Sequence, residues 1–479
     1  MPSSAPKRAC DQCHTLKEKC RRLSPAAPCE RCDRLNHNCQ TTRNIAKTGR
    51  KPRMARKLSY NLPASNLNAD PHSPTPVSTL SQDTPYAHFY FSLNDGLGNN
   101  TALFPDLDQW EIHFVNLMKD IVAPSPLDKY LIGPSFHETH HRSFVQNLLQ
   151  PTPTLKHATV ACAAVLLGDK YAQYNKASVE IGHRRAALAV SGLRSLQISQ
   201  DQDLITAVRI GIAMVTFAMH VAHGQSFLIS RYTLSLVKPM YSRLLTMDSG
   251  TMDFLMCLVS TETLDCLLKS EIPTIRIGED DRNNVVDRYI GLSSSLFAHL
   301  YDICEVASIL RHTDGRMDIK ITKQLKTIQD RLDQWQPSPP PDFLEQFSQD
   351  EVVRMLAQTE VLRLAALLII HRLKHPFGQY DEKALLLSRA ITAEFDMVLQ
   401  VTGRSIPCTA LAYMVASFEI TSAEEQSAII TKSDEMVTFS LQSQVRVKNI
   451  MYSVWNARSF GDQIHWFDLG DYIGKAETK

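Results

Sequence analysis

The sequence predicts a mainly α protein with a small cysteine-rich N-terminal unit, a flexible linker and a large all-α domain. Six of the eleven cysteines lie between Cys10 and Cys39. In the stretch 59–85, 16 of 27 residues are Ser, Thr, Asn or Pro, and none is Lys, Arg or Glu. Such a composition buries too little apolar surface to order itself. From about Leu103 onward, apolar residues recur at helical spacing. The expected parts are 1–45, a basic arm and linker at 46–102, and 103–479.

Three segments of the large part carry the clearest helical pattern. In 317–335, apolar residues follow one another at spacings of four, three, four and three, which places them on one face of a helix. A proline cluster that begins at Pro337 then ends it. Segments 285–311 and 351–375 show similar spacing, and Pro376 ends the latter. Alternating strand patterns are scarce and no internal repeat is evident, so we expect an all-α domain of about a dozen helices. The first stripe consists of Ile321, Leu325, Ile328, Leu332 and Trp335.

Charge divides the chain in the same place as cysteine content. Residues 1–60 contain 15 Lys or Arg and 4 Asp or Glu, a balance of +11, whereas the remaining residues carry a balance of −10. A basic N-terminal segment on an otherwise acidic chain predicts that this segment binds a polyanion.

Hydropathy argues against a membrane or secreted protein. The longest nearly uninterrupted apolar run, Ile210–Ala222, has 13 residues and includes Thr216 and His220, whereas a span needs about 20 residues. The first residues show no apolar signal-peptide core before Cys10. We therefore interpret the cysteines as metal ligands or buried thiols rather than disulfides.

The cysteine spacing is the most specific signal in the chain. It reads Cys10-x2-Cys13-x6-Cys20-x8-Cys29-x2-Cys32-x6-Cys39, so two halves share the spacing C-x2-C-x6-C. Zinc takes four ligands tetrahedrally, and thiolates are among its preferred ones. Six cysteines can complete two zinc sites only if two thiolates are shared, and the repeat makes one from each half plausible. Thirty residues build little core, so metal binding should supply most of this unit's folding free energy.

These cysteines, the Ala9-Cys10-Asp11 start and the prolines in the loop resemble the fungal binuclear zinc cluster (Zn2Cys6) transcription factors. The resemblance implies two Zn²⁺ ions held by all six cysteines, with Cys10 and Cys29 bridging. It also implies a nuclear, sequence-specific factor that binds double-stranded DNA, commonly at CGG-type sites, and regulates RNA polymerase II transcription. Its partners would be the transcription machinery or co-regulators. Relatives often control metabolic gene clusters. We expect no enzyme, because the sequence shows no phosphate loop, nucleophile elbow or paired-carboxylate motif, and no membrane partner, because it has no apolar run long enough to span a bilayer.

The resemblance also assigns DNA contacts. It places the segment between the second and third cysteines in the major groove, where relatives carry several basic residues; Lys17 and Lys19 match this pattern, and Leu16 and Glu18 depart from it. The expected DNA-binding residues are His14, Lys17, Lys19, Arg21 and Arg22.

A basic arm follows the cluster. It predicts a nuclear-import signal and a phosphate-contacting segment, and the alternative is a merely solvated linker. Residues 40–60 lack an a/d apolar repeat, and Gly49 and Pro52 interrupt any helix, so no coiled coil is expected there and the oligomeric state stays open. The arm residues are Arg50, Lys51, Arg53, Arg56 and Lys57.

Two histidine motifs invite a different interpretation. His137-Glu138-Thr139-His140-His141 satisfies the zinc-protease pattern H-E-x-x-H, but no acidic third ligand occurs between Thr139 and Gly168. We expect no catalytic residue there and interpret it as a surface segment between helices. His371 and His375 fit a helix C-terminus, where cationic groups favour the helix dipole. A loose resemblance to the helical regulatory region of the same factors spans roughly 110–400.

Two further features have competing interpretations. Cys162, Cys257, Cys266, Cys304 and Cys408 have no paired spacing, so buried thiols are expected. The acidic and aromatic tail 466–473, and less so the stretch 104–110, predict either an activation segment or packing against helices. For the whole chain, the competing hypotheses are a ligand-sensing or enzyme-like function in the helical domain, and a zinc scaffold that does not bind DNA.

Overall fold

A computed structural model describes two compact units, one within Met1–Ser81 and one within Gln82–Lys479. The described residues are 9–11, 13, 20, 27–35, 39–41, 107–109, 111–112, 129–150, 152–170, 175–221, 225–279, 281–459 and 463–477. They contain helices and no strand, only an isolated bridge between Asp287 and Gly291. The predicted mainly α class is confirmed.

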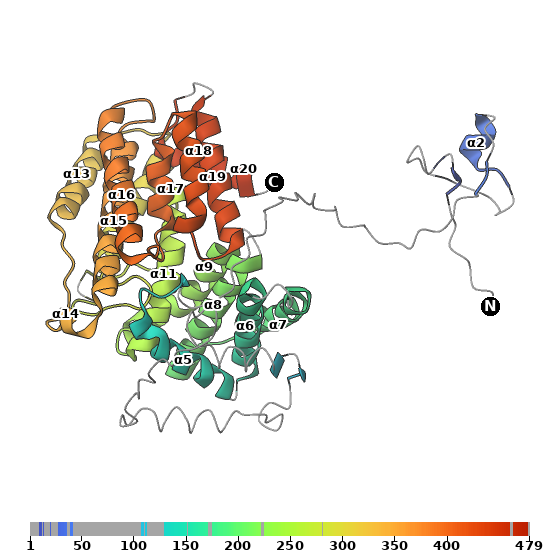
Figure 1. The fold of residues 1–479 in the computed structure, drawn as a ribbon, viewed down its shortest axis with the longest axis horizontal. Coiled ribbons are helices and arrows are strands. Elements are labelled where there is room, and N and C mark those ends of the chain that lie inside the picture. The colour runs from blue at the N-terminus through green and yellow to red at the C-terminus, as the bar shows by residue number, and fades with distance from the viewer. Residues whose placement is uncertain are drawn as a thin grey trace, which may run out of the picture. The chain divides into compact units, whose positions relative to one another are not determined.

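The first half of the large unit is built from helices of up to 21 residues (Figure 1). Helix α6 lies against α7 and α8, and α11 packs on both α8 and α9. The bounds are η3 (Pro134–Phe136), α5 (His137–Leu149), α6 (Pro153–Lys170), α7 (Asn175–Ser195), α8 (Asp201–Val221), α9 (Gln225–Val237), η5 (Lys238–Met240), α10 (Tyr241–Leu244) and α11 (Ser249–Lys269).

The second half of the large unit is also built from packed helices. Helices α15, α16 and α17 lie side by side, α19 packs on α17 and α8, and α20 returns to α11 (Figure 1). The bounds are α12 (Leu296–His312), α13 (Ile319–Gln334), α14 (Phe343–Gln346), α15 (Gln349–Lys374), α16 (Asp381–Thr402), α17 (Ala410–Phe418), α18 (Ala423–Met436), α19 (Leu441–Ser459), η6 (Trp466–Asp468) and α20 (Leu469–Glu477).

Two of the predicted helices form where the periodicity placed them. In α13 the buried stripe is Ile321, Leu325, Ile328 and Leu332, and the Asp318 carboxylate caps the helix by accepting the Ile321 N–H at 2.7 Å. Helix α15 begins at a capping box made by Ser348 and Glu351. The capping satisfies backbone donors that have no partner inside the helix, and it sets where each helix starts.

The predicted helix at 285–311 is shorter than expected. Only α12, from Leu296, is helical, and the stretch before it is a loop. The Asp287 carboxylate accepts the N–H groups of Tyr289 and Ile290, and Gly291 has a φ of +55°. A local side-chain bond of this kind competes with helix formation, and a left-handed residue stops it.

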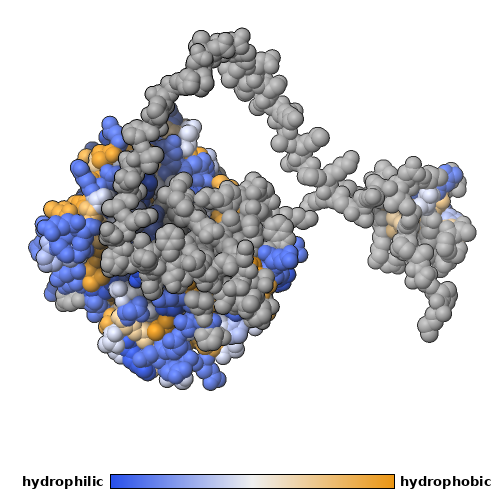
Figure 2. Space-filling view, turned by 60° about the horizontal axis from the view of Figure 1, so that its bottom comes forward, coloured by the Kyte–Doolittle hydropathy of each residue, from blue (hydrophilic) through white to orange (hydrophobic). Residues whose placement is uncertain are grey.

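Helix α8 is the central helix of the large unit. By length and composition it could cross a membrane, but 67% of its most apolar window is buried inside the fold, as in the core helix of a soluble protein. On the face in Figure 2, hydrophobic residues of the described surface form small areas among hydrophilic ones. The apolar residues of the long helices therefore serve one large internal core.

Candidate metal centre

The N-terminal unit repeats one local arrangement in each cysteine half. Cys29 is the N-cap of α2 (Glu30–Arg34), and its sulfur accepts the backbone N–H of Cys32 at 3.4 Å. In the first half, the Cys10 sulfur accepts the N–H of Cys13 at the same distance, 3.4 Å, and Asp11 and Cys13 are helical. The first two cysteines of each half thus lie on the opening turn of a short helix.

The third cysteine of each half also occupies an equivalent place. The Cys20 sulfur accepts the N–H of Cys10 at 3.3 Å, and the Cys39 sulfur accepts the N–H of Cys29 at 3.2 Å. The backbone N–H of Asp11 donates to the carbonyl of Gln40 at 2.8 Å and joins the two halves. The repeat in the sequence is therefore a repeat in space.

The six sulfurs form two overlapping groups of four. One group is Cys10, Cys13, Cys20 and Cys29, the other is Cys10, Cys29, Cys32 and Cys39, and within each group the sulfurs lie within 4.8 Å of one another. Cys10 and Cys29 belong to both groups. Their sulfurs are 3.8 Å apart, and those of Cys13 and Cys29 are 3.6 Å apart. Four ligands at about 2.3 Å from a tetrahedral zinc lie about 3.8 Å apart, so each group has the spacing of a zinc site.

The electrostatics of the cluster favour bound cations. Burial and the neighbouring sulfurs of Cys10 and Cys29 raise the pKa of the Cys13 thiol to about 12. Burial also opposes ionisation of Cys10, but bonds from the Cys13 N–H and nearby thiols lower its pKa to about 5. The protein alone thus stabilises only part of the negative charge of six thiolates, and two Zn²⁺ ions would supply the remainder.

The predicted DNA contacts are not placed by this geometry. His14, Lys17, Lys19, Arg21 and Arg22 lie outside the described residues, as do Arg50, Lys51, Arg53, Arg56 and Lys57 of the arm.

The structure adds two basic residues that sequence reasoning did not select. Arg31 and Arg34 lie on α2 beside the buried ligand Cys32, and Arg34 is exposed. Their position beside the second C-x2-C pair could have identified them in the sequence. That pair begins α2, just as the first C-x2-C pair begins the first helix.

The H-E-x-x-H motif forms no metal site. Contrary to the expected segment between helices, His137 opens helix α5, and Glu138 pairs with Arg142 on the surface at 2.7 Å. His140 instead packs against Phe254 and Tyr289. Among the described residues, only the two cysteine groups bring three or more metal-ligating atoms together.

The tail does not have the exposure of an activation segment. Trp466 is fully buried, and its indole N–H donates to the carbonyl of Leu267 at 2.8 Å. Phe467, Leu469 and Ile473 are also buried, so the alternative, packing against helices, is correct for this segment. Of the earlier stretch, Leu107 is buried in the core, and Phe104–Asp106 and Trp110 lie outside the described residues.

The fold and the cysteine geometry define a zinc-cluster protein with a large helical domain, and comparison with known families agrees. The fungal Zn(2)-Cys(6) binuclear cluster domain matches residues 8–48, and the fungal specific transcription factor domain matches residues 130–474. The latter covers more than two thirds of the chain. The chain therefore belongs to the fungal specific transcription factor family, and its cluster domain binds two zinc ions through six cysteines. It is a fungal DNA-binding transcription factor. No curated protein and no solved structure matches the chain.

Proposed function

We propose that the chain is a nuclear, sequence-specific regulator of RNA polymerase II transcription that reads CGG-type sites through its zinc cluster. The observation that carries the proposal is the pair of four-sulfur groups sharing Cys10 and Cys29. This arrangement organises two short helices around two ions in a unit too small for an apolar core. The +11 balance of residues 1–60 supports a polyanionic partner.

We assign a role to each of the three parts that the sequence predicts. Residues 1–45 bind DNA, 46–102 form the arm and linker, and 103–479 form the regulatory domain. The regulatory domain recruits co-regulators and controls a metabolic gene cluster. Within the cluster, His14, Lys17, Lys19, Arg21 and Arg22 contact DNA, and the exposed Arg34 on α2 adds a further positive charge to this unit. We propose no enzymatic activity, and the surface pairing of Glu138 with Arg142 supports this for the H-E-x-x-H motif.

A pair of substitutions tests base reading against charge alone. Lysine can donate to the O6 and N7 acceptors of guanine in the major groove. Lys17→Ala should therefore cost about 1–3 kcal/mol on the preferred site and little on random DNA. Arg56→Ala, the matched loss of one positive charge, should weaken all duplexes alike and lower the slope of log K against log salt by about 1.

The experiment uses the zinc-loaded full chain. Sites are first selected from random duplex DNA, which tests the CGG assignment, and both variants are then titrated on the selected and a scrambled duplex at two salt concentrations. Full discrimination by the Lys17→Ala variant would refute the role of that residue. Absence of any enriched sequence would refute sequence-specific binding.

Nuclear entry is tested separately. Replacing Arg50, Lys51, Arg53, Arg56 and Lys57 by Ala in a fluorescent fusion should leave it largely cytoplasmic. Unchanged nuclear accumulation would show that this run is a solvated linker.

A further inference from the structure

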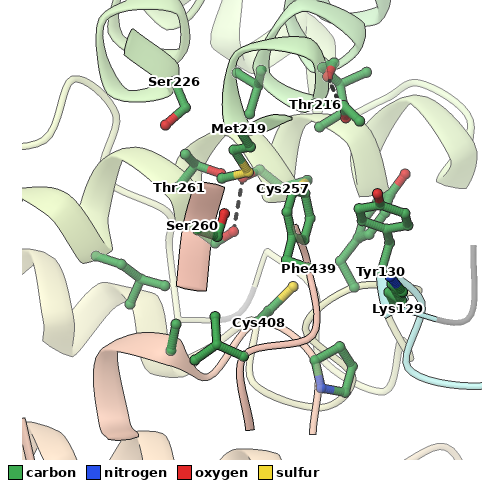
Figure 3. Close-up of a pocket in the computed structure, with 18 of the residues that line it drawn as sticks. Lys129, Tyr130, Thr216, Met219, Ser226, Cys257, Ser260, Thr261, Cys408 and Phe439 are labelled. Carbon is green, nitrogen blue, oxygen red and sulfur yellow. Dashed lines mark hydrogen bonds between the residues drawn. The ribbon is translucent and has the colours of Figure 1, made fainter. Parts of the chain in front are cut away.

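A cavity of about 240 Å³ in the helical domain, partly open to solvent, is bordered by α8, α11, the segment before α17 and the segment before α19. In the close-up, Met219 of α8, Cys408 and Phe439 approach the same space from three segments far apart in the sequence (Figure 3). A space of this size that is partly open to solvent can admit a small ligand.

Helix α8 turns one continuous face to this space. Arg209, Ala213, Thr216 and Met219 follow one another at spacings of four, three and three, which places them on one side of the helix. All four are only partly buried, whereas most of the residues between them are fully buried. From Arg209 to Met219 the face extends over ten residue steps of the helix, or about 15 Å.

Helix α11 contributes a similar stripe. Its partly buried residues Cys257, Thr261 and Leu264 follow the same spacing and line the same cavity. Helices α8 and α11 also contact each other directly. The two stripes therefore border one shared space.

The wall is apolar although it contains several hydroxyl groups. The Thr216 hydroxyl donates to the carbonyl of Ile212 at 3.0 Å, and the Thr261 and Ser260 hydroxyls donate to the carbonyl of Cys257 at 2.8 and 2.9 Å. Hydroxyls that bond back to their own helix present their carbon atoms to the cavity. Burial raises the pKa of the Cys408 thiol to about 12, which keeps it neutral. Most of the wall therefore suits a hydrocarbon surface.

Four charged side chains border this cavity: Lys129, Arg209, Asp265 and Arg446. Asp265 and Arg446 pair with each other at 2.9 Å, and Lys129 is exposed, so Arg209 is the partly buried charge that matters here. The Arg209 guanidinium donates from Nη1 to the side-chain oxygen of Asn147 at 3.1 Å, while its buried Nε has no hydrogen-bond partner among the described residues. Within that same part of the chain, no carboxylate lies within ion-pair distance of it. Burial lowers the pKa of Arg209, and the negative charge of Asp248, which lies beyond ion-pair distance, offsets this only in part. A partly buried cation without a direct ion pair is costly, and a bound anion would reduce that cost.

We infer that this cavity binds a small apolar carboxylic acid, with its hydrocarbon part between α8 and α11 and its carboxylate on Arg209. A planar guanidinium offers paired N–H donors that match the two oxygens of a carboxylate. A cavity of about 150 Å³ accommodates benzene, so about 240 Å³ accommodates roughly eight to ten carbon atoms. Cys408, which borders the cavity, has a φ of +58°, and backbone held in the left-handed region is concentrated at ligand sites. The inference goes beyond the proposed DNA-binding function and does not depend on it.

Binding is tested on the zinc-loaded full chain with octanoate and octan-1-ol, which share a chain length and differ in charge. Titration calorimetry should show one octanoate site per chain and weaker binding of octanol. Arg209→Met should weaken octanoate by about 10- to 100-fold, the range of one charged hydrogen-bonded contact, and leave octanol nearly unchanged. Arg209→Lys should retain most of the octanoate affinity.

Two controls separate the site from general effects. Arg389→Met removes the same charge from an exposed position on α16 and should change neither affinity. Ala213→Phe fills the cavity and should abolish binding of both compounds, with circular dichroism confirming the fold. If that variant does not fold, thermal unfolding replaces it as the test. Octanoate should then raise the melting temperature of the wild-type protein and leave that of Arg209→Met unchanged.

The inference is overturned by either of two results. In the first, octanoate and octanol bind equally and Arg209→Met changes neither, so the anionic part of the assignment is wrong. In the second, neither compound binds nor moves the melting temperature. Both readouts are independent of DNA, so failure here is distinguishable from failure of the proposed function.

Discussion

Arg372, near the end of α15, should be the most costly single arginine to remove from the helical domain. Its side chain is fully buried, and Nε and Nη2 donate to the two carboxylate oxygens of Glu419 at 2.9 and 2.5 Å. Nη2 also donates to Asp381 at 2.6 Å, and Nη1 donates to the carbonyls of Pro376 and Gln379 at 3.0 and 2.9 Å. All five guanidinium N–H donors are therefore used.

The magnitude follows from what the substitution leaves behind. Arg372→Met removes the cation and strands the Glu419 carboxylate, whose side chain is 2% exposed. Breaking a buried pair from one side typically costs about 3–5 kcal/mol, whereas replacing both partners by apolar residues is often nearly neutral. The double variant Arg372→Met/Glu419→Leu should consequently be more stable than Arg372→Met alone.

The assay is urea unfolding of the zinc-loaded chain followed by circular dichroism. Arg363→Met on the same helix is the matched control, because Arg363 and its partner Glu360 are 19% and 37% exposed. This substitution leaves no fully buried carboxylate behind and should cost less than Arg372→Met. The reasoning is refuted if Arg372→Met costs no more than Arg363→Met. It is equally refuted if the double variant loses at least the sum of its two single variants.

Three further predictions concern the cluster, acid stability and the tail. Elemental analysis should give two zinc ions per wild-type chain and about one for Cys13→Ser. Cys29→Ser should retain fewer, since Cys29 belongs to both sulfur groups. Equal loss of zinc in both variants would contradict the sharing of Cys29. Burial opposes ionisation of Glu111, but bonds from Arg185 and other donors lower its pKa from 4.5 to about 2. Because the folded pKa is depressed, Glu111 stabilises the fold above about pH 4.5 by at most about 3 kcal/mol, and this is lost as pH falls toward 2. The stability gap between wild type and Glu111→Gln should thus narrow over that range in pH-dependent unfolding, and a constant gap would show that the carboxylate is not responsible. Trp466→Phe should cost about 1–3 kcal/mol in the same assay by leaving the Leu267 carbonyl unsatisfied; an unchanged midpoint would show that the tail is not anchored there.

Sequence alone determined the features that depend on short-range spacing. The C-x2-C-x6-C repeat required two shared sulfurs for two zinc ions, and the structure shares Cys10 and Cys29. The apolar stripe of α13 and the proline that follows α15 located those helices, because helix periodicity and proline chemistry act within a few residues.

Only the tertiary structure decided which distant segments certain side chains contact and how deeply those side chains are buried. The tail has an acidic and aromatic composition suited to exposure, yet the pocket for Trp466 is supplied by α11, some 200 residues earlier. Arg372 lies near the end of α15, and its buried partner Glu419 is 47 residues away in the sequence. Cys162, Cys257 and Cys408 were expected to be buried thiols, but they border the cavity in the helical domain and are only partly buried. These outcomes depend on contacts between distant segments, and no periodicity within one segment carries information about its partner.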